Sequence, residues 1–310
     1  MASTGNAGAT RPHIFIQTNN KQSIGAIVSA YSMKRSPHAD QFDVTIMHKE
    51  DYPWFAKREG QNYKRHGVER TWHENDLQSF TLTRFMPPKI MGYKGRALVV
   101  DPDVFAVQDV WELLTRDMQG KAIMCRGSKF KNGAFASSVM LLDCAKLKHW
   151  DVEKGFNELF EGKRDYHNWI SLLMEDRETI GTFEDEWNDF DKLTPATKMI
   201  HNTRRRTQPW KTGLKVDYTP TEFVPVIGWI MRMRRKMFGD HALLGRYAKH
   251  PDPKQEQLFY GLLKGAYEAG MVTDAQIKEA MDKNYIRHDS VEVMKAAPTL
   301  PPISPLKAAA

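Results

Sequence analysis

The sequence predicts an α/β fold in which a single sheet carries flanking helices. A strand is expected at residues 13–18, a helix at 23–34 and a second strand at 42–47. This strand–helix–strand order is typical of a parallel α/β sheet, because parallel neighbours need a crossover connection. Hydrophobic residues make up 41% of the 310-residue chain, which is ordinary for a folded protein with a large core. Three later apolar runs extend the predicted sheet, at residues 95–100, 121–126 and 137–143.

The predicted helix at 23–34 is rich in small side chains. Gly25, Ala26 and Ala30 lie within it and would let the helix backbone approach the sheet closely. The loop between the first strand and this helix, TNNKQS, is polar and contains no glycine.

After these strands the sequence continues the same α/β domain and then becomes mainly helical. Helical periodicity at 147–162 and 165–178 continues the α/β part, and the character of the chain changes after Pro220. Beyond that point the sequence is mainly helical, with a capping box predicted from Thr273 to Gln276. The expected organisation is a disordered leader at 1–12, an α/β domain at 13–220, a helical C-terminal extension at 221–287 and a disordered tail at 288–310.

Charge and cysteine content narrow the class of protein. The formal net charge of +7 favours an anionic partner, such as a phosphorylated ligand, a membrane surface or nucleic acid. Cys125 and Cys144 lie in predicted buried strands and make no disulfide framework, which indicates a reducing, cytoplasmic compartment. No segment is apolar over the roughly 18 residues that a membrane span needs. Residues 227–238 alternate apolar and basic side chains, which fits a helix on the inner face of an anionic membrane or a helix packed on the α/β domain.

Two aspartates stand at the end of the predicted strand at 95–100. In an extended segment Asp101 and Asp103 would point to the same side, where they could hold one cation together. Pro102 cannot donate to a sheet ladder, so strand pairing should stop there and leave the carboxylates at the edge where open α/β sheets bind ligands. Hard divalent cations prefer such oxygen ligands. Asp and Pro also favour a simple turn, and these three residues alone do not separate the two interpretations.

Four segments, taken in order, resemble the family-8 glycosyltransferases. They are IFIQTNNKQSIGAIVSAYSMKRS, RFMPPKIMGYKGRALVVDPDVFAVQDVWELL with its DxD, FEDEWNDFD with its Trp-Asn pair, and HNTRRRTQPWKTG. The resemblance spans roughly residues 13–215. It implies a GT-A fold, a Rossmann-like sheet that binds a nucleotide sugar. It also implies that a hexose is transferred from a UDP-sugar with retention of configuration, in a reaction that depends on Mn²⁺ or Mg²⁺.

The resemblance implies catalytic roles for several residues around the DxD. Asp101 and Asp103 match the DxD itself, His201 matches the third metal ligand, and Arg84 matches a basic residue that reaches the donor. Negative charge builds on the diphosphate during transfer, so a cation and basic side chains would lower the barrier. The expected mechanism is a front-face one, in which the departing phosphate oxygen helps to deprotonate the acceptor. Asp165 is the catalytic candidate if a carboxylate is needed instead.

Other matching positions would bind the donor. Thr18 and Asn19 fall in the nucleotide-contacting loop, and Ser137 stands in FASSVML, where the family usually has an Asn-Ala/Ser-Gly segment facing the sugar. In the late motif Gln208 replaces the family's lysine, whose role would pass to Lys211 or to the arginines before it. The departure in FASSVML, together with the absence of the family's Asp-Gln pair from DYHNWISLL, leaves the identity of the hexose open.

Two other functions fit part of the sequence. A sugar-phosphate nucleotidyltransferase also binds a nucleotide and a cation, but it typically has a Gly-rich, basic loop where this chain has TNNKQS. A nucleic-acid-binding protein fits the positive charge, but no zinc finger or RNP sequence is present, so nucleic-acid binding is not expected. The expected partners are a UDP-sugar donor and a glycan, lipid-linked or small-molecule acceptor.

Overall fold

The chain folds into two compact units. The computed structural model describes residues 10–127, 133–218, 230, 233–234, 237–239 and 243–304. The first unit contains Met1–Glu74, Ser79–His201 and Pro301–Ala310, and the second contains Asn75–Gln78 and Asn202–Leu300. The main division between the units therefore falls after His201 rather than at the expected boundary near 220.

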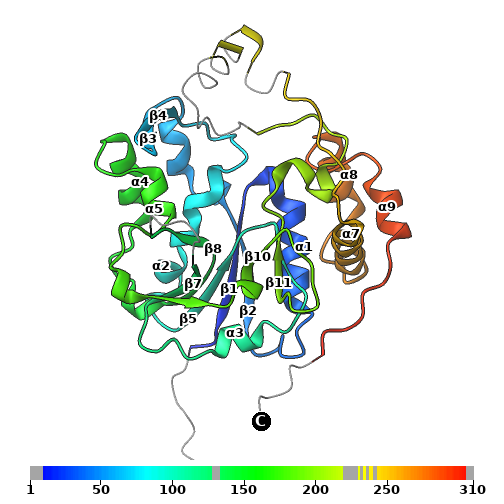
Figure 1. Ribbon diagram of the computed structural model, residues 1–310, viewed down its shortest axis with the longest axis horizontal. Helices are drawn as coiled ribbons and strands as arrows, with labels where there is room; N and C mark the ends of the chain where they lie inside the picture. The colour runs from blue at the N-terminus through cyan, green and yellow to red at the C-terminus, as the bar shows by residue number, and fades with distance from the viewer. Residues whose placement is uncertain are drawn as a thin grey trace, which may run out of the picture. The chain divides into compact units, whose positions relative to one another are not determined.

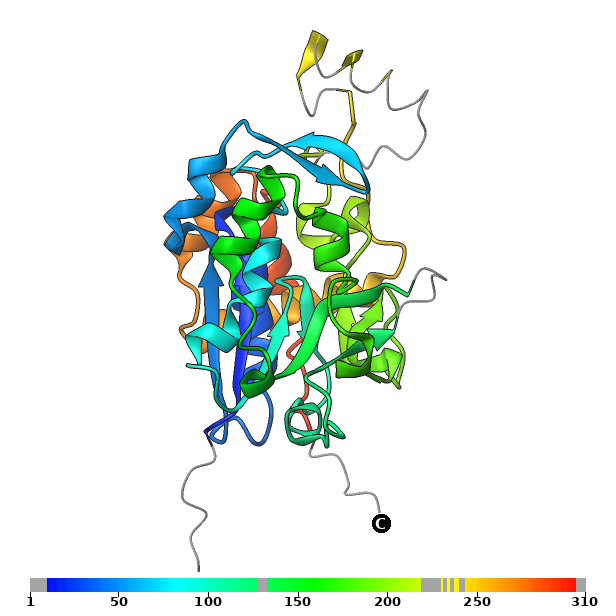
Figure 2. The same ribbon diagram turned by 90° about the vertical axis from the view of Figure 1, so that its left-hand side faces the viewer.

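The first unit is built on a six-stranded sheet, which confirms the predicted α/β class. Its strands are β1 His13–Thr18, β2 Asp43–His48, β5 Arg96–Val100, β7 Ile123–Gly127, β8 Phe135–Asp143 and β9 Ile180–Phe183. Their order in the sheet is β2-β1-β5-β8-β7-β9. β1 runs parallel to β2, beside which it lies in both views (Figures 1 and 2), and also parallel to β5.

Strand β8 makes the sheet mixed rather than all-parallel, because it runs antiparallel to both β5 and β7. Only residues 128–134 join β7 to β8. A parallel neighbour would need a crossover of about a dozen residues or more, so this short connection makes the chain turn back. All of β8 from Ser137 to Leu142 is buried, as expected for a central strand.

Helix α1 (Ser23–Lys34) approaches the chain beyond β5 closely, as its small residues predict. A Cβ atom at Gly25 would lie 2.8 Å from the carbonyl oxygen of Pro102, so the position has no room for a larger residue unless the backbone shifts. One turn further along, Ser29 Oγ donates to the carbonyl oxygen of Val104 at 2.7 Å. The helix therefore supports the segment that carries the two aspartates.

A three-stranded sheet lies beyond that segment. It contains β10 Asp189–Phe190, β11 Met199–His201 and β6 Val104–Ala106, in that order. The first unit also contains the hairpin of β3 Asn62–Arg65 and β4 Val68–Thr71, and the α-helices α2 Pro87–Ile90, α3 Trp111–Thr115, α4 Val152–Phe160 and α5 Tyr166–Ile170. The antiparallel pairing of β11 with β6 brings the late part of this unit next to the DxD segment.

The second unit contains three helices, α7 Pro253–Glu268, α8 Asp274–Asp282 and α9 Ser290–Ala296, among its described residues. The capping box predicted at Thr273 is present at the start of α8. Helix α9 lies in the segment that was expected to be disordered. The helix forms because it has buried anchors: Met294 is 3% exposed, and Ser290 Oγ lies 3.0 Å from the hydroxyl of Tyr260 in α7.

Residues 227–238, for which membrane contact was one of two interpretations, lie mostly outside the described residues. The described residues among them are Ile230, Met233, Arg234, Met237 and Phe238, of which Arg234 is half-buried and the others are exposed. In the described part of the chain, no helix is both long and apolar enough to cross a membrane.

Candidate metal centre

Asp101, Asp103 and His201 lie together in the first unit. One ligand atom from each side chain falls within 4.8 Å of the others. Asp101 directly follows β5, and His201 ends β11, where it pairs with Val104 of β6, the residue after Asp103. The pairing of β11 with β6 thus brings His201 next to the two aspartates, although it lies far from them in the sequence. This group has the donors that a divalent cation requires.

The two aspartates lie on a turn and not on an extended strand. The N–H of Val104 donates to the carbonyl oxygen of Asp101 at 3.2 Å, and Pro102 and Asp103 occupy the centre of the turn. Proline favours the second position of such a turn because its φ angle is already restricted. The two interpretations left open by the sequence are therefore compatible: the segment turns, and its carboxylates still converge on His201.

Burial and the neighbouring charges have opposite effects on the pKa values of Asp101 and His201. Burial raises the pKa of Asp101, although the nearby Arg84 and His201 partly offset that effect. The guanidinium of Arg84 lies 2.9 Å from Asp101 Oδ1 and 3.2 Å from Oδ2. Burial lowers the pKa of His201, but the surrounding carboxylates, Asp103 first among them, raise it above its usual value overall. The buried carboxylates therefore favour a positive charge at this point.

Two amide side chains complete the surroundings of the ligands, and neither was among the predicted site residues. Gln17 Nε2 donates to Asp101 Oδ1 and its Oε1 accepts from Thr83 Oγ1 at 3.3 Å. Asn188 Oδ1 lies 2.9 Å from His201 Nδ1. The register of β1 with β5 would have indicated Gln17, because Ile16 pairs with Val100 and the next residues on the two strands are Gln17 and Asp101.

Thr18 and Asn19 lie at the carboxyl end of β1, on the edge of the sheet where Asp101 follows β5. Both side chains are buried and form hydrogen bonds within the protein. Thr18 is 0% exposed and its hydroxyl donates to the carbonyl oxygen of Asn19 at 3.2 Å. Asn19 Nδ2 donates to Ser79 Oγ at 3.3 Å. Their predicted contact with a nucleotide stays a prediction.

Arg84 and Ser137, each expected to contact the donor, lie within hydrogen-bonding distance of one another. Arg84 lies near the end of the 3-10 helix η4 (Ser79–Phe85), where it is buried. Its Nη1 donates to Ser137 Oγ. The hydroxyl of Ser137 in turn donates to the carbonyl oxygen of Ile170. Because Arg84 also pairs with Asp101, it links the metal centre to the strand segment expected to face the donor sugar.

Asp165 caps a helix. Its carboxylate accepts from the N–H groups of His167 and Asn168 at the start of α5 and from those of His66 and Gly67 in the β3–β4 turn. Burial raises the pKa of Asp165, but these backbone donors outweigh it and hold that pKa below its usual value. A carboxylate occupied in this way serves the local structure.

Replacing Asp165 by Asn distinguishes a capping role from a catalytic one. We expect Asp165→Asn to lower the free energy of unfolding by about 1 kcal/mol, the usual scale of a cap. Activity should stay within about threefold of the unaltered chain, since a factor of ten would correspond to 1.4 kcal/mol at the barrier. The measurements are urea denaturation and release of UDP from the UDP-sugar donor that the family resemblance implies. Asp151→Asn, at the N-cap of α4, is the matched control. A thousand-fold loss of activity in Asp165→Asn alone would contradict the capping role.

Lys211 lies in the second unit, where it is buried in an ion pair. Its Nζ is 2.8 Å from Asp217 Oδ2 and 3.4 Å from the carbonyl oxygen of Asn284, and the residue is 1% exposed. The predicted contact of Lys211 with a donor would require this pair to open, and it stays a prediction.

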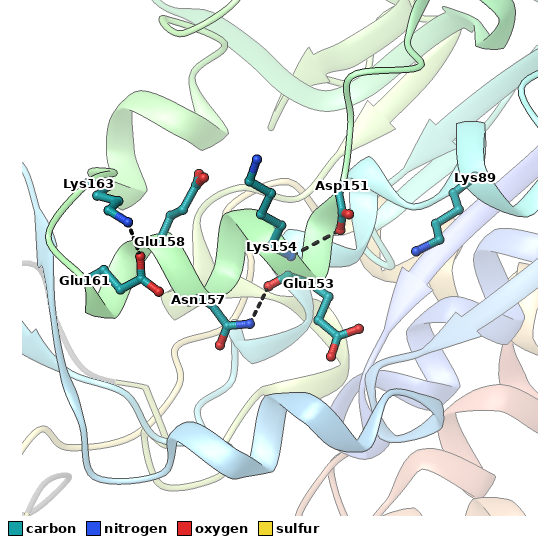
Figure 3. Close-up of a pocket in the computed structure, with 8 residues that line it drawn as sticks. All are labelled: Lys89, Asp151, Glu153, Lys154, Asn157, Glu158, Glu161 and Lys163. Atoms are coloured by element: carbon teal, nitrogen blue, oxygen red, sulfur yellow. Dashed lines mark hydrogen bonds and ion pairs between the residues drawn. The ribbon is translucent and has the colours of Figure 1, made fainter.

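A separate hollow of about 450 Å³ lies along α4, on the first unit (Figure 3). Its lining is charged, but much of the lining is bonded within itself: Lys163 Nζ lies 2.7 Å from Glu161 Oε2, and Asp151 caps the helix through the N–H of Lys154. The metal-centre residues do not line it. The hollow is therefore distinct from the candidate site.

No protein-family model matches the sequence, and no curated protein sequence matches it significantly. Among solved structures the chain is similar to galactosyltransferase LgtC in complex with donor and acceptor sugar analogues, at 12% identity and a TM-score of 0.46, over 64% of this chain and 89% of that one. It is also similar to the glycosyltransferase GlyE of Streptococcus pneumoniae TIGR4, at 13% identity and a TM-score of 0.47, over 85% of this chain but only 64% of that one.

A third similar structure is mouse xyloside xylosyltransferase 1, at 12% identity and a TM-score of 0.41, over 62% of this chain and 97% of that one. All three matched proteins are glycosyltransferases by name. At such identities and TM-scores, the donors and acceptors of those proteins are not assigned to this chain.

Proposed function

We propose that the protein is a metal-dependent glycosyltransferase of the family-8 type, with a GT-A fold, which transfers a hexose from a UDP-sugar with retention of configuration. The convergence of Asp101, Asp103 and His201 on one point carries this proposal. That point lies where β5 ends, and open α/β sheets bind their ligands beyond the carboxyl ends of the strands. The acceptor would be a glycan, a lipid-linked sugar or a small molecule.

The donor set fits Mn²⁺ or Mg²⁺. Two carboxylates held close repel each other unless a positive charge lies between them. Carboxylate oxygens suit Mn²⁺ and Mg²⁺, and a neutral imidazole is a common metal ligand in proteins. Asp101, Asp103 and His201 would hold the cation. A cation there supplies positive charge that stabilises the diphosphate as the sugar departs.

Arg84 supports an anionic donor on separate grounds. Its Nε is buried and has no hydrogen-bond partner among the described residues, although both terminal nitrogens are engaged. An unpaired buried N–H is costly, and a phosphate oxygen would satisfy it. Arg84 also forms an ion pair with Asp101, one of the three candidate ligands, and so provides positive charge beside it.

The proposed chemistry needs no carboxylate nucleophile. In a front-face transfer the departing phosphate oxygen takes the proton of the acceptor hydroxyl on the same side of the sugar. The role of the protein is then to hold the donor, balance its charge and exclude water that would hydrolyse it. The position of Asp165 fits this mechanism. Its carboxylate caps α5, and a front-face transfer requires no carboxylate at the reacting carbon.

A donor screen tests the proposal. UDP-hexoses and UDP-pentoses are incubated with the protein and Mn²⁺, and UDP release is measured together with UDP binding by calorimetry. We expect metal-dependent UDP binding and preferred turnover of one UDP-hexose. If no UDP-sugar is bound or hydrolysed with either Mn²⁺ or Mg²⁺, the proposed function is wrong.

A further inference from the structure

Asn188 contacts the metal centre through the ring nitrogen of His201 that faces away from the aspartates. It is the last residue of the 3-10 helix η7 (Asp185–Asn188) and is 0% exposed. Its Oδ1 lies 2.9 Å from His201 Nδ1, and its Nδ2 donates to Ser138 Oγ at 3.0 Å. Both ends of the amide therefore have partners, so its oxygen is held toward the imidazole.

The backbone of Asn188 is held as firmly as its side chain. Its carbonyl oxygen accepts a hydrogen bond from Arg126 Nη1 at 2.5 Å, and Arg126 Nη2 lies 2.8 Å from Asp185 Oδ2 at the other end of η7. The guanidinium of Arg126 also packs over the ring of Phe190 at 4.1 Å. The residue is thus fixed from strand β7, from strand β8 and from its own helix.

The hydrogen bond from His201 to Asn188 determines which imidazole nitrogen is available to a metal. A neutral imidazole has one N–H and one lone pair, and only the nitrogen with the lone pair can be a ligand. An amide oxygen accepts but does not donate, so the proton belongs on Nδ1. The lone pair is then on Nε2, which lies 3.3 Å from Asp103 Oδ1 on the side of the carboxylates.

We propose that Asn188 is a positioning residue for the metal centre, which accepts the Nδ1–H of His201 and so directs Nε2 toward the cation held with Asp101 and Asp103. This inference rests on the proposed metal-dependent function. Outer partners of metal-binding histidines generally act in this way, fixing both the tautomer and the orientation of the ring.

Two substitutions at Asn188 separate its acceptor oxygen from its volume. Asn188→Asp keeps an acceptor for His201, whereas Asn188→Leu keeps a similar size and removes it. Mn²⁺ affinity is measured by the EPR signal of free Mn²⁺, with Mn²⁺ alone and with UDP added. We expect Asn188→Leu to weaken Mn²⁺ binding by about 10–100-fold and Asn188→Asp to stay within about threefold.

Control variants and an unfolding measurement test whether a loss of Mn²⁺ affinity comes from a general effect of the substitution or from reduced stability. Asn157→Leu, on α4, makes the same change at a half-buried position away from the cluster and should leave Mn²⁺ affinity unchanged. Thermal unfolding in EDTA reports the stability of every variant without metal. If Asn188→Leu does not fold, Ser138→Ala removes the partner of Asn188 Nδ2 and should weaken Mn²⁺ binding by a smaller factor.

A double variant shows whether Asn188 acts through His201. In a His201→Gln background, adding Asn188→Leu should change Mn²⁺ affinity little, because the group that Asn188 orients is already gone. Equal Mn²⁺ affinity in Asn188→Leu, Asn188→Asp and the unaltered chain would overturn the inference and leave the proposed function standing. If the unaltered chain binds no Mn²⁺, alone or with UDP, then the proposed metal centre is wrong and the inference falls with it.

Discussion

Asp103→Asn is expected to lower the rate of sugar transfer by about 10³-fold at a fixed Mn²⁺ concentration, which corresponds to about 4 kcal/mol at the barrier. The substitution keeps the size of the side chain but removes one of the two negative charges that would hold the cation beside His201. Without that charge the cation is bound more weakly, and the departing diphosphate loses its stabilisation. The measurement is UDP release with the preferred UDP-sugar over a range of Mn²⁺ concentrations.

Asp40→Asn is the matched control for this prediction, because it makes the same change at an exposed aspartate. It should leave the rate within about twofold, as exposed substitutions away from a site rarely matter. Circular dichroism should show that both variants fold. Transfer by Asp103→Asn at the rate of the unaltered chain would remove the metal centre from the mechanism.

Arg84→Met is expected to lower the free energy of unfolding by about 3–5 kcal/mol, because it leaves the buried carboxylate of Asp101 without its cation. Arg84 is 6% exposed, and its pair with Asp101 is shielded from water. Methionine has a similar length, so loss of packing is a minor part of the change. Urea denaturation of the metal-free protein measures the effect.

Two further variants show that the loss comes from the charge pair. The double variant Arg84→Met with Asp101→Asn removes both charges and should be more stable than Arg84→Met alone, which gives a coupling of about 2 kcal/mol. Arg11→Met, which breaks the exposed pair of Arg11 with Asp43, should cost less than about 1 kcal/mol. Additive losses for Arg84 and Asp101 would show that their pairing does not stabilise the fold.

Local sequence patterns were sufficient to predict the first two strands of the sheet and the helix between them. The strands expected at 13–18 and 42–47 and the helix expected at 23–34 match β1, β2 and α1 to within one residue. Each is a short element whose apolar pattern and flanking polar residues are contained within it, so neighbouring residues determine it. Gly25 was identified for the same reason, since a glycine in a helix that packs on a sheet indicates a close approach.

Long-range pairing accounts for most of what the sequence did not predict. The direction of β8 follows from the short link to β7, and the order of α9 follows from the contact of Ser290 with Tyr260. Asp165 was predicted only as a fallback catalytic residue, and the sequence did not show that the β3–β4 turn and the start of α5 meet at its carboxylate. These features depend on which segments meet, which composition and periodicity do not encode.

The sequence by itself determined the class of fold and, through a family resemblance, the three residues of the candidate metal centre. Asp101 and Asp103 follow an apolar strand, and a strand end is a local feature of the chain. Only the tertiary structure decided how these residues meet. The pairing of β11 with β6 places His201 beside Asp103, with Nδ1 of its ring next to Asn188 and Nε2 next to Asp103. The physical reason is that both depend on the register and packing of segments distant in the chain, which a one-dimensional pattern does not contain.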